Sequence, residues 1–140
     1  MNIRYRSATV EDASVIAPMN AQLIRDQGHR NTMTVTQLAD RMAEWLKGEY
    51  QAYLFEFESE TIGYALYRLE PEYVYLRQLF VQPEMRRQGI ARRALEWLGR
   101  NAWHVRARVR IDVLVGNQTG IEFWRSVGFM DYCFTMERPV

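Results

Sequence analysis

The chain has 140 residues, with 18 Lys and Arg against 17 Asp and Glu, so its formal net charge is +1. This length supports one hydrophobic core and predicts a single domain over residues 1–140. A charge so close to zero argues against nucleic acid as a partner, because polyanion binders are strongly basic. No stretch reaches the ~20 apolar residues that cross a bilayer, which argues against a membrane protein.

The sequence contains one cysteine, Cys133, which excludes an intramolecular disulfide and a cysteine-based metal cluster. His29 and His104 are not in metal-ligand spacing, so no metal site is predicted. Together these features favour a reducing compartment, and we expect a cytoplasmic protein. Cys133 itself alternates with bulky neighbours and is predicted to fill the core.

The first half of the chain predicts one short strand followed by two helices. The strand covers residues 3–7. Thr9 and Asp12 then stand in the spacing of a capping box, and Thr34 and Gln37 repeat that spacing before a second apolar stripe of helical period. The two helices are therefore expected over about 9–27 and 34–46.

The second half begins with runs of β-forming residues that are separated by polar turns, which predicts a three-stranded antiparallel meander. Helical and strand patterns then alternate to the end of the chain. The expected strands are 51–57, 61–69, 73–81, 108–115 and 129–137, and the expected helices are 89–103 and 118–127. The predicted order of elements is β-α-α-β-β-β-α-β-α-β, which indicates a fold that contains both helices and strands around one core.

The densest functional signal is the junction between the strand 73–81 and the next helix. A helix start leaves backbone N–H groups without intrahelical partners, and the helix dipole adds partial positive charge there. Gly89 lets the backbone approach a phosphate closely, and Arg86 and Arg87 add formal charge. A lone glycine in a solvated basic turn is the alternative interpretation of this junction.

The hexapeptide Arg86-Arg87-Gln88-Gly89-Ile90-Ala91 matches the [Q/R]-x-x-G-x-[G/A] signature of the GCN5-related N-acetyltransferase (GNAT) family, which the sequence resembles here. A second block, 117–129, resembles the family's Asn-x-x-Ala-x-x-Phe-Tyr-x-x-x-Gly-Phe stretch. Gly120 replaces the usual alanine and Trp124 the usual tyrosine. The resemblance implies a GNAT-like α/β fold of the α+β type, with one mostly antiparallel mixed sheet and flanking helices. This sheet would be splayed at the cofactor site, between the strands 73–81 and 108–115.

The resemblance also implies an activity: transfer of an acetyl group from acetyl-CoA to a primary amine of a small molecule or a peptide, directly and in a ternary complex. Main-chain groups of the strand would pair with pantetheine, and N–H groups of the loop and helix start would hold the pyrophosphate. The cofactor-binding residues implied are Leu79, Phe80, Val81, Arg86, Arg87, Gln88, Gly89, Ile90, Ala91, Arg92, Asn117, Phe123 and Trp124.

Side chains for acid and base catalysis are less clearly indicated. The candidates are Trp124 and Tyr132 for protonation of the leaving sulfur and Tyr75, which occupies the place of the family's strand glutamate. An indole is not a practical acid, and a thiol of pKa about 8.5 can leave as thiolate. Packing is an equally good role for Trp124. A phenol is a poor base, so three routes to a neutral amine remain open: deprotonation through ordered water, binding of an amine that is already neutral, or deprotonation by a carboxylate. The candidate carboxylates are Glu70, Glu72 and Asp112, the last expected to face Arg110.

Two other functions compete with catalysis. A catalytically silent acyl-CoA binding domain would explain the missing tyrosine and strand glutamate. A nucleic-acid surface would use the arginines between 86 and 110, against which the near-zero net charge argues. The acceptor itself has no readable motif, although the resemblance favours a homodimer.

Overall fold

The computed structural model describes all residues 1–140 and contains one five-stranded sheet in the order β1-β2-β3-β4-β5. Its strands are β1 (Arg4–Ser7), β2 (Tyr50–Phe57), β3 (Glu60–Leu69), β4 (Tyr73–Val81) and β5 (Arg108–Arg110). Every neighbouring pair is antiparallel except β4 and β5, which are parallel. The predicted α+β architecture with a mostly antiparallel sheet is therefore confirmed.

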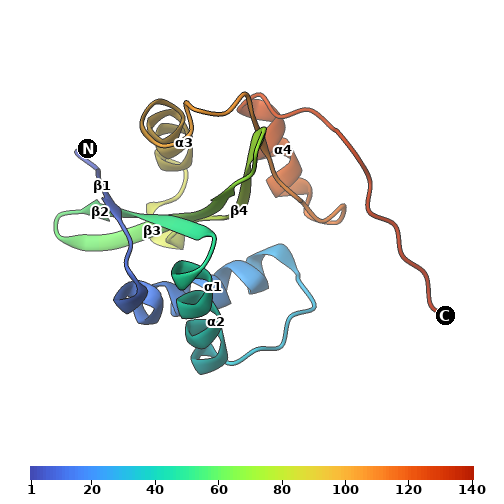
Figure 1. Ribbon diagram of the computed structural model, residues 1–140, viewed down its shortest axis with the longest axis horizontal. Helices are drawn as coiled ribbons and strands as arrows, with labels where there is room; N and C mark the ends of the chain where they lie inside the picture. The colour runs from blue at the N-terminus through green and yellow to red at the C-terminus, as the bar shows by residue number, and fades with distance from the viewer.

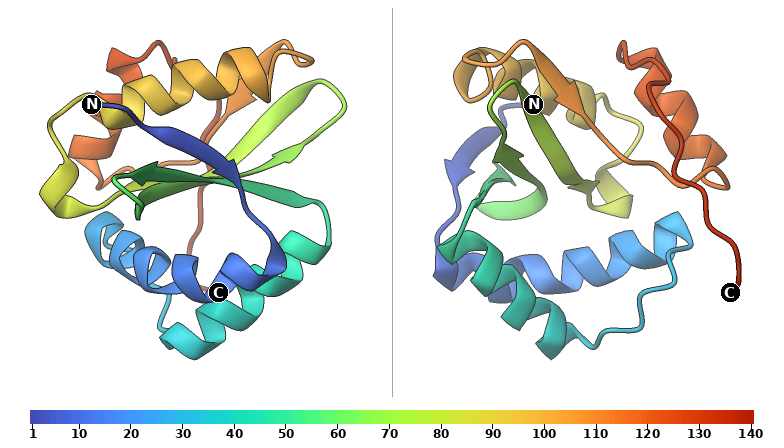
Figure 2. Two further views of the ribbon diagram at one scale, coloured as in Figure 1. Left: turned by 90° about the vertical axis from the view of Figure 1, so that its left-hand side faces the viewer. Right: turned by 45° about the vertical axis from the view of Figure 1, so that its right-hand side comes forward.

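Helices cover both faces of this sheet (Figures 1 and 2). The helices are α1 (Ala13–Gln27), α2 (Val35–Lys47), α3 (Ile90–Asn101) and α4 (Gln118–Ser126), with short 3-10 turns η1 (Val10–Asp12) and η2 (Pro83–Met85). Helices α1 and α2 lie on one face and α3 on the other, while α4 stands beside β4 (Figure 1). The capping box of α2 is present as predicted, because Thr34 Oγ1 accepts from the Gln37 N–H at 3.2 Å.

Each face of the sheet has its own hydrophobic core. Under α1 and α2, fully buried side chains such as Ile16, Met42 and Leu54 pack against the sheet. On the other face, Ala94 and Leu98 of α3 are fully buried against it. The sheet is therefore packed between helices on both of its faces. None of the helices combines the length and the apolar character that crossing a membrane requires.

An irregularity in β4 changes which side chains face each layer. Leu66 pairs with Gln78 and Tyr67 with Leu76, so Arg77 is an extra residue without a partner on β3. Such a bulge reverses the alternation of side chains beyond it. As a result Arg77 and Gln78, although consecutive, both face the layer of α1 and α2, where they contact Tyr50 and Tyr64, respectively.

Two strand predictions for the C-terminal part are wrong. The strand expected over 108–115 ends at Arg110, and the strand expected over 129–137 does not form. Residues 129–140 instead run away from the domain as an extended segment (Figure 1). A β-strand pattern becomes a strand only beside a neighbour that satisfies its backbone groups, and none lies along these residues. For the same reason Cys133 is exposed and does not fill the core.

Candidate functional site

Strands β4 and β5 diverge after three paired residues, which opens the sheet. Their pairing runs from Tyr73 with Arg108 to Tyr75 with Arg110 and stops there, whereas β4 continues to Val81. The edge of β4 that faces away from β3 is therefore unpaired along the predicted residues Leu79, Phe80 and Val81 (Figure 2, right). An unpaired edge presents backbone N–H and C=O groups that an extended ligand can bind as an added strand.

The loop after β4 ends in a cluster of free backbone donors. Arg87 and Gly89 both have left-handed backbone conformations, with φ of 66° and 75°. The first hydrogen bond into α3 is from the Arg93 N–H to the Gly89 carbonyl oxygen, at 3.0 Å. The six N–H groups of residues 87–92, which include Gln88, Ile90, Ala91 and Arg92, have no acceptor within the protein. Consecutive free N–H groups at a helix N-terminus are a typical binding site for phosphate.

The side chain of Arg86 turns away from this loop. Its Nε donates to the Val81 carbonyl oxygen at 2.8 Å, and its Nη2 is 2.6 Å from Asp26 Oδ2 on α1. Its guanidinium also stacks over Phe80. Arg86 thus ties the loop to β4 and α1, which leaves Arg87 as the cation of the loop whose side chain has no partner in the protein.

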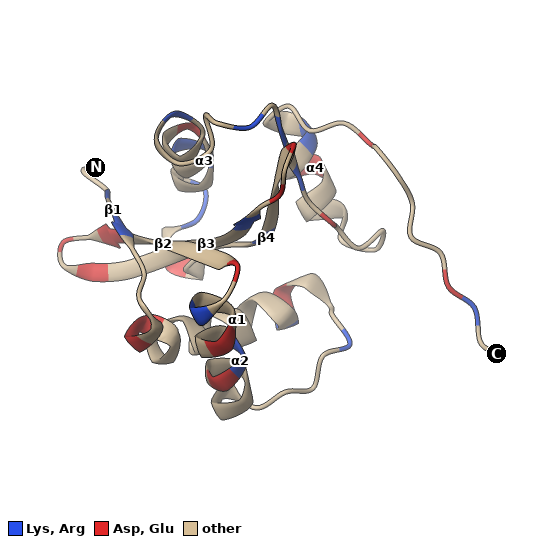
Figure 3. Ribbon diagram, in the orientation of Figure 1, with Lys and Arg blue, Asp and Glu red and all other residues tan.

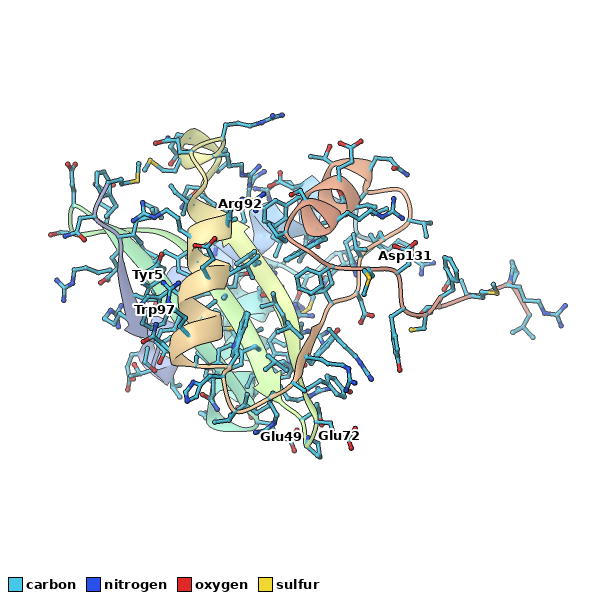
Figure 4. All side chains as sticks on the ribbon, turned by 90° about the horizontal axis from the view of Figure 1, so that it is seen from above. Tyr5, Glu49, Glu72, Arg92, Trp97 and Asp131 are labelled. Carbon is cyan, nitrogen blue, oxygen red and sulfur yellow. The ribbon has the colours of Figure 1, made fainter.

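Arg92 lies between α3 and α4. Its Nη2 reaches the Ser126 carbonyl oxygen at 3.4 Å, so it joins the start of α3 to the end of α4. Figure 4 shows Arg92 and Glu72 at opposite ends of the molecule, with the sheet between them. The predicted phosphate-binding residues are therefore far from the turn between β3 and β4.

The predicted residues of α4 have structural partners within the helix and its surroundings. Asn117 caps α4, since its Oδ1 accepts from the Gly120 N–H at 3.1 Å. A Cβ at position 120 would overlap the Asn117 side-chain amide, so a larger residue there would require this amide to shift. Trp124 is half-buried and makes edge-to-face contacts with Phe123 and Phe129, at centroid distances of 5.1 and 5.2 Å. These contacts favour a packing role for Trp124.

The point where β4 and β5 separate carries a tyrosine–aspartate pair. Tyr75 Oη donates to Asp112 Oδ2 at 2.7 Å. Burial, together with the hydrogen bond to Asp112, raises the pKa of Tyr75 to about 12. Arg110 does not oppose Asp112 as the sequence predicted, because its guanidinium stacks over Tyr73 at 4.0 Å and donates to Tyr132 Oη at 3.2 Å.

The other candidate carboxylates lie elsewhere. Glu70 pairs with Arg68. Glu72 is exposed in the turn before β4, at the closed end of the sheet (Figure 4). Glu72 lies five positions before Arg77 in the sequence, which corresponds to about 16 Å along a strand. Among the three carboxylates that the sequence left open, Asp112 alone adjoins the opening between β4 and β5.

A group of cationic and aromatic side chains on the α1 and α2 face was not predicted as part of the site. Arg41 and Trp45, one turn apart on α2, meet Arg77 of β4 and Tyr50 of β2. Their i, i+4 spacing could have indicated that Arg41 and Trp45 are neighbours. No sequence pattern places Arg77 with them, because its orientation depends on the bulge.

Charges elsewhere are mixed. Basic and acidic residues are both spread over the molecule (Figure 3). A hollow of about 360 Å³ lies between the α1–α2 connection and the C-terminal segment, where Arg30 and Glu137 form an ion pair at 2.9 Å. No group of three or more His, Cys, Asp or Glu side chains is arranged to hold a metal ion.

The family model for the acetyltransferase (GNAT) family matches residues 21–129 of the chain. The search of curated proteins gives no match. Among solved structures, a possible acetyltransferase from Clostridium difficile 630 has a TM-score of 0.83 at 15% identity, covering 100% of this chain and 98% of the other.

Two further similar structures contain a coenzyme A species. A predicted acetyltransferase from Clostridium acetobutylicum, solved with acetyl-CoA, has a TM-score of 0.76 at 17% identity over 99% of this chain and 96% of the other. The aminoglycoside N-acetyltransferase AAC(6')-Iy, in complex with CoA, has a TM-score of 0.77 at 15% identity over 99% and 95%.

Proposed function

The chain belongs to the acetyltransferase (GNAT) family, and from that premise we propose that it transfers acetyl from acetyl-CoA directly to a primary amine in a ternary complex. The observation that carries this proposal is the continuity between the unpaired edge of β4 and the six free N–H groups of residues 87–92. The two features suit the two parts of coenzyme A, a chain with amides and a pyrophosphate.

In this proposal backbone groups bind most of the acetyl-CoA. Leu79, Phe80 and Val81 pair with the pantetheine amides, and the N–H groups from Arg87 to Arg92 bind the pyrophosphate. Arg87 and Gly89 give this loop its left-handed turns, and the N–H groups of residues 87–92 have no acceptor within the protein. Arg86 contributes indirectly by fixing the loop, since its own donors are engaged by Val81 and Asp26.

The chemical step requires a neutral amine that attacks the thioester carbon, after which the carbon–sulfur bond breaks and the amine loses a proton. We propose Asp112 as the acceptor of that proton, directly or through water. Tyr75 stays protonated at any working pH, because its pKa is about 12, and so it orients the Asp112 carboxylate by donation. A backbone N–H at the Arg77 bulge would polarise the thioester carbonyl.

No strong acid is needed at the leaving sulfur in this account. Trp124 is held between two phenylalanines, and an indole N–H cannot donate its proton to a base. Tyr132 lies on the exposed C-terminal segment. A thiolate is a good leaving group, with a thiol pKa of about 8.5, and we infer that it leaves unaided.

Release of free thiol from acetyl-CoA, measured with a panel of primary amines, tests the proposal. Asp112→Asn should lower kcat by about 10²-fold or more, with acetyl-CoA binding unchanged. Glu72→Gln, which removes a carboxylate at the closed end of the sheet, is the matched control and should keep the wild-type rate. Acetyl-CoA binding without turnover of any amine would instead favour a silent acyl-CoA binding domain.

We also propose that two copies of the chain pair through the C-terminal segment. Met130, Tyr132, Phe134 and Met136 alternate along it and are between 74 and 87% exposed. At roughly 150 Å² each, these side chains would bury about 1,200 Å² in a two-fold pair, which is the lower bound for a stable interface. An antiparallel pairing of the segment with its own copy would satisfy the backbone groups of both.

Sedimentation of the full chain tests this pairing. The wild type should have twice the 16.6 kDa mass of one chain, and the double variant Phe134→Glu/Met136→Glu should be monomeric. Val35→Glu, at another exposed apolar position, is the control and should remain dimeric. A monomeric wild type at micromolar concentration would refute the pairing.

A further inference from the structure

The arginine pair on the α1 and α2 face indicates which amines the enzyme accepts. We propose that the acceptor carries a carboxylate near its amine, and that Arg41 and Arg77 bind this carboxylate. The inference rests on the proposed function, since it concerns the acceptor of the same transfer.

The two guanidinium groups lie close together without a carboxylate between them. Arg41 and Arg77 both stack on Trp45, at 4.3 and 4.5 Å from the ring centroid, so they are within about 9 Å of each other. Neither forms an ion pair, whereas the neighbouring Arg68 pairs with Glu70. Burial, and to a smaller extent the charge of Arg77, lowers the pKa of Arg41. A bound anion would offset the repulsion between the two guanidinium groups.

Two buried donors beside the Arg41 guanidinium also lack an acceptor. Nε of Arg41 has no hydrogen-bond partner, and neither has Nδ2 of Asn20, a fully buried residue of α1 whose Oδ1 is 3.5 Å from Arg41 Nη2. Both orphaned groups are donors. Buried donors without acceptors are rare in folded proteins, so the protein does not neutralise this cluster from within.

The position of Arg77 links the cluster to the reaction. Arg77 is the bulged residue of β4 and lies two residues from Tyr75, which bonds the proposed base Asp112. Two residues along a strand span about 7 Å. In an acceptor whose carboxylate is bound by Arg77 and whose amine lies near Tyr75, the two groups would therefore be only a few bonds apart. Planar guanidinium groups match carboxylates in bidentate geometry, and Trp45 and Tyr50 restrict Arg77 by stacking on it.

Binding of glutarate, a carboxylate probe without an amine, tests the cluster independently of turnover. Calorimetry at low salt should detect glutarate binding to the wild type and a loss of at least about tenfold in Arg77→Gln and Arg41→Gln. Lys47→Gln removes an exposed cation from the same helix and should bind as the wild type does. Equal affinity in all four proteins, or no binding to the wild type, would overturn the inference. Tighter binding of inorganic phosphate would also overturn it, in favour of a phosphorylated acceptor.

Turnover of matched acceptors tests the link to catalysis. Amino acids from glycine to 6-aminohexanoate are each compared with their carboxamides. The free acids should be preferred at one chain length, and Arg77→Gln should lower kcat/KM for the preferred acid by a factor at least about tenfold larger than for its amide. If the enzyme acetylated other amines but not these acids, the proposal that the acceptor carries a carboxylate would be refuted. The proposed acetyl transfer itself would still hold. If no amine is acetylated, the proposed function fails, and glutarate binding still decides whether the arginine pair binds carboxylates.

Discussion

Replacement of Gly89 separates the role of the pyrophosphate loop from that of the fold. Gly89 has a φ of 75°, and a Cβ built on it meets no protein atom within 4 Å. Gly89→Val therefore causes no clash within the protein, and its cost to folding comes from the left-handed backbone, about 1–2 kcal/mol. With about 4 °C lost per kcal/mol in a domain of this size, Tm should fall by about 4–8 °C.

The same Cβ would stand among the free N–H groups of residues 87–92, where the phosphates are proposed to approach. We expect acetyl-CoA to bind Gly89→Val at least about tenfold more weakly, which is about 1.4 kcal/mol. At 100 times the wild-type Kd, acetyl-CoA should stabilise the wild type by about 2.7 kcal/mol and the variant by correspondingly less. Thermal melts with and without acetyl-CoA, together with calorimetry, measure both effects.

Gly28 provides a matched control. It ends α1 with a φ of 66°, and a Cβ there also meets open space. Gly28→Val should lose a similar amount of stability and retain wild-type affinity for acetyl-CoA. If both variants bound acetyl-CoA as the wild type does, the pyrophosphate site proposed for the loop would be wrong. If both lost affinity equally, the loss would reflect backbone strain and not a local contact.

Three further outcomes follow from the packing. Gly63→Ala should lower the free energy of unfolding in urea by about 3 kcal/mol, because its Cβ would overlap the Phe80 carbonyl oxygen; wild-type stability would contradict the close approach of β3 and β4. Trp124→Phe should keep kcat within about twofold and lose some stability, and a thousandfold lower kcat in a folded variant would refute unaided thiolate departure. Tyr67 and Tyr75 have pKa values raised to about 12 by burial, so their contribution to stability is complete below pH 10 and is lost between about pH 10 and 12. Urea unfolding should show that the free energy of unfolding falls across that pH range, and that it falls less in Tyr67→Phe. An equal fall in the variant would mean that Tyr67 does not contribute to this pH dependence.

The order of elements and the family could be predicted from local patterns. Capping boxes, helical stripes and turn residues act over a few positions, so Thr34 and Gln37 marked the start of α2 without knowledge of the fold. The hexapeptide around Gly89 was readable for the same reason, since a strand end, a left-handed glycine and a helix start adjoin in sequence. These features predicted the phosphate site proposed here.

Tertiary contacts decided the features that depend on distant partners. Asp112 bonds Tyr75 and not Arg110, because β4 and β5 diverge just beyond that pair. The pattern of residues 129–137 is that of a strand, but strands form only against a neighbour, so this segment remains extended and exposed. The bulge that turns Arg77 toward Arg41 arises from the register between β3 and β4. A one-residue shift in register reverses every later side chain, and local sequence alone does not determine it.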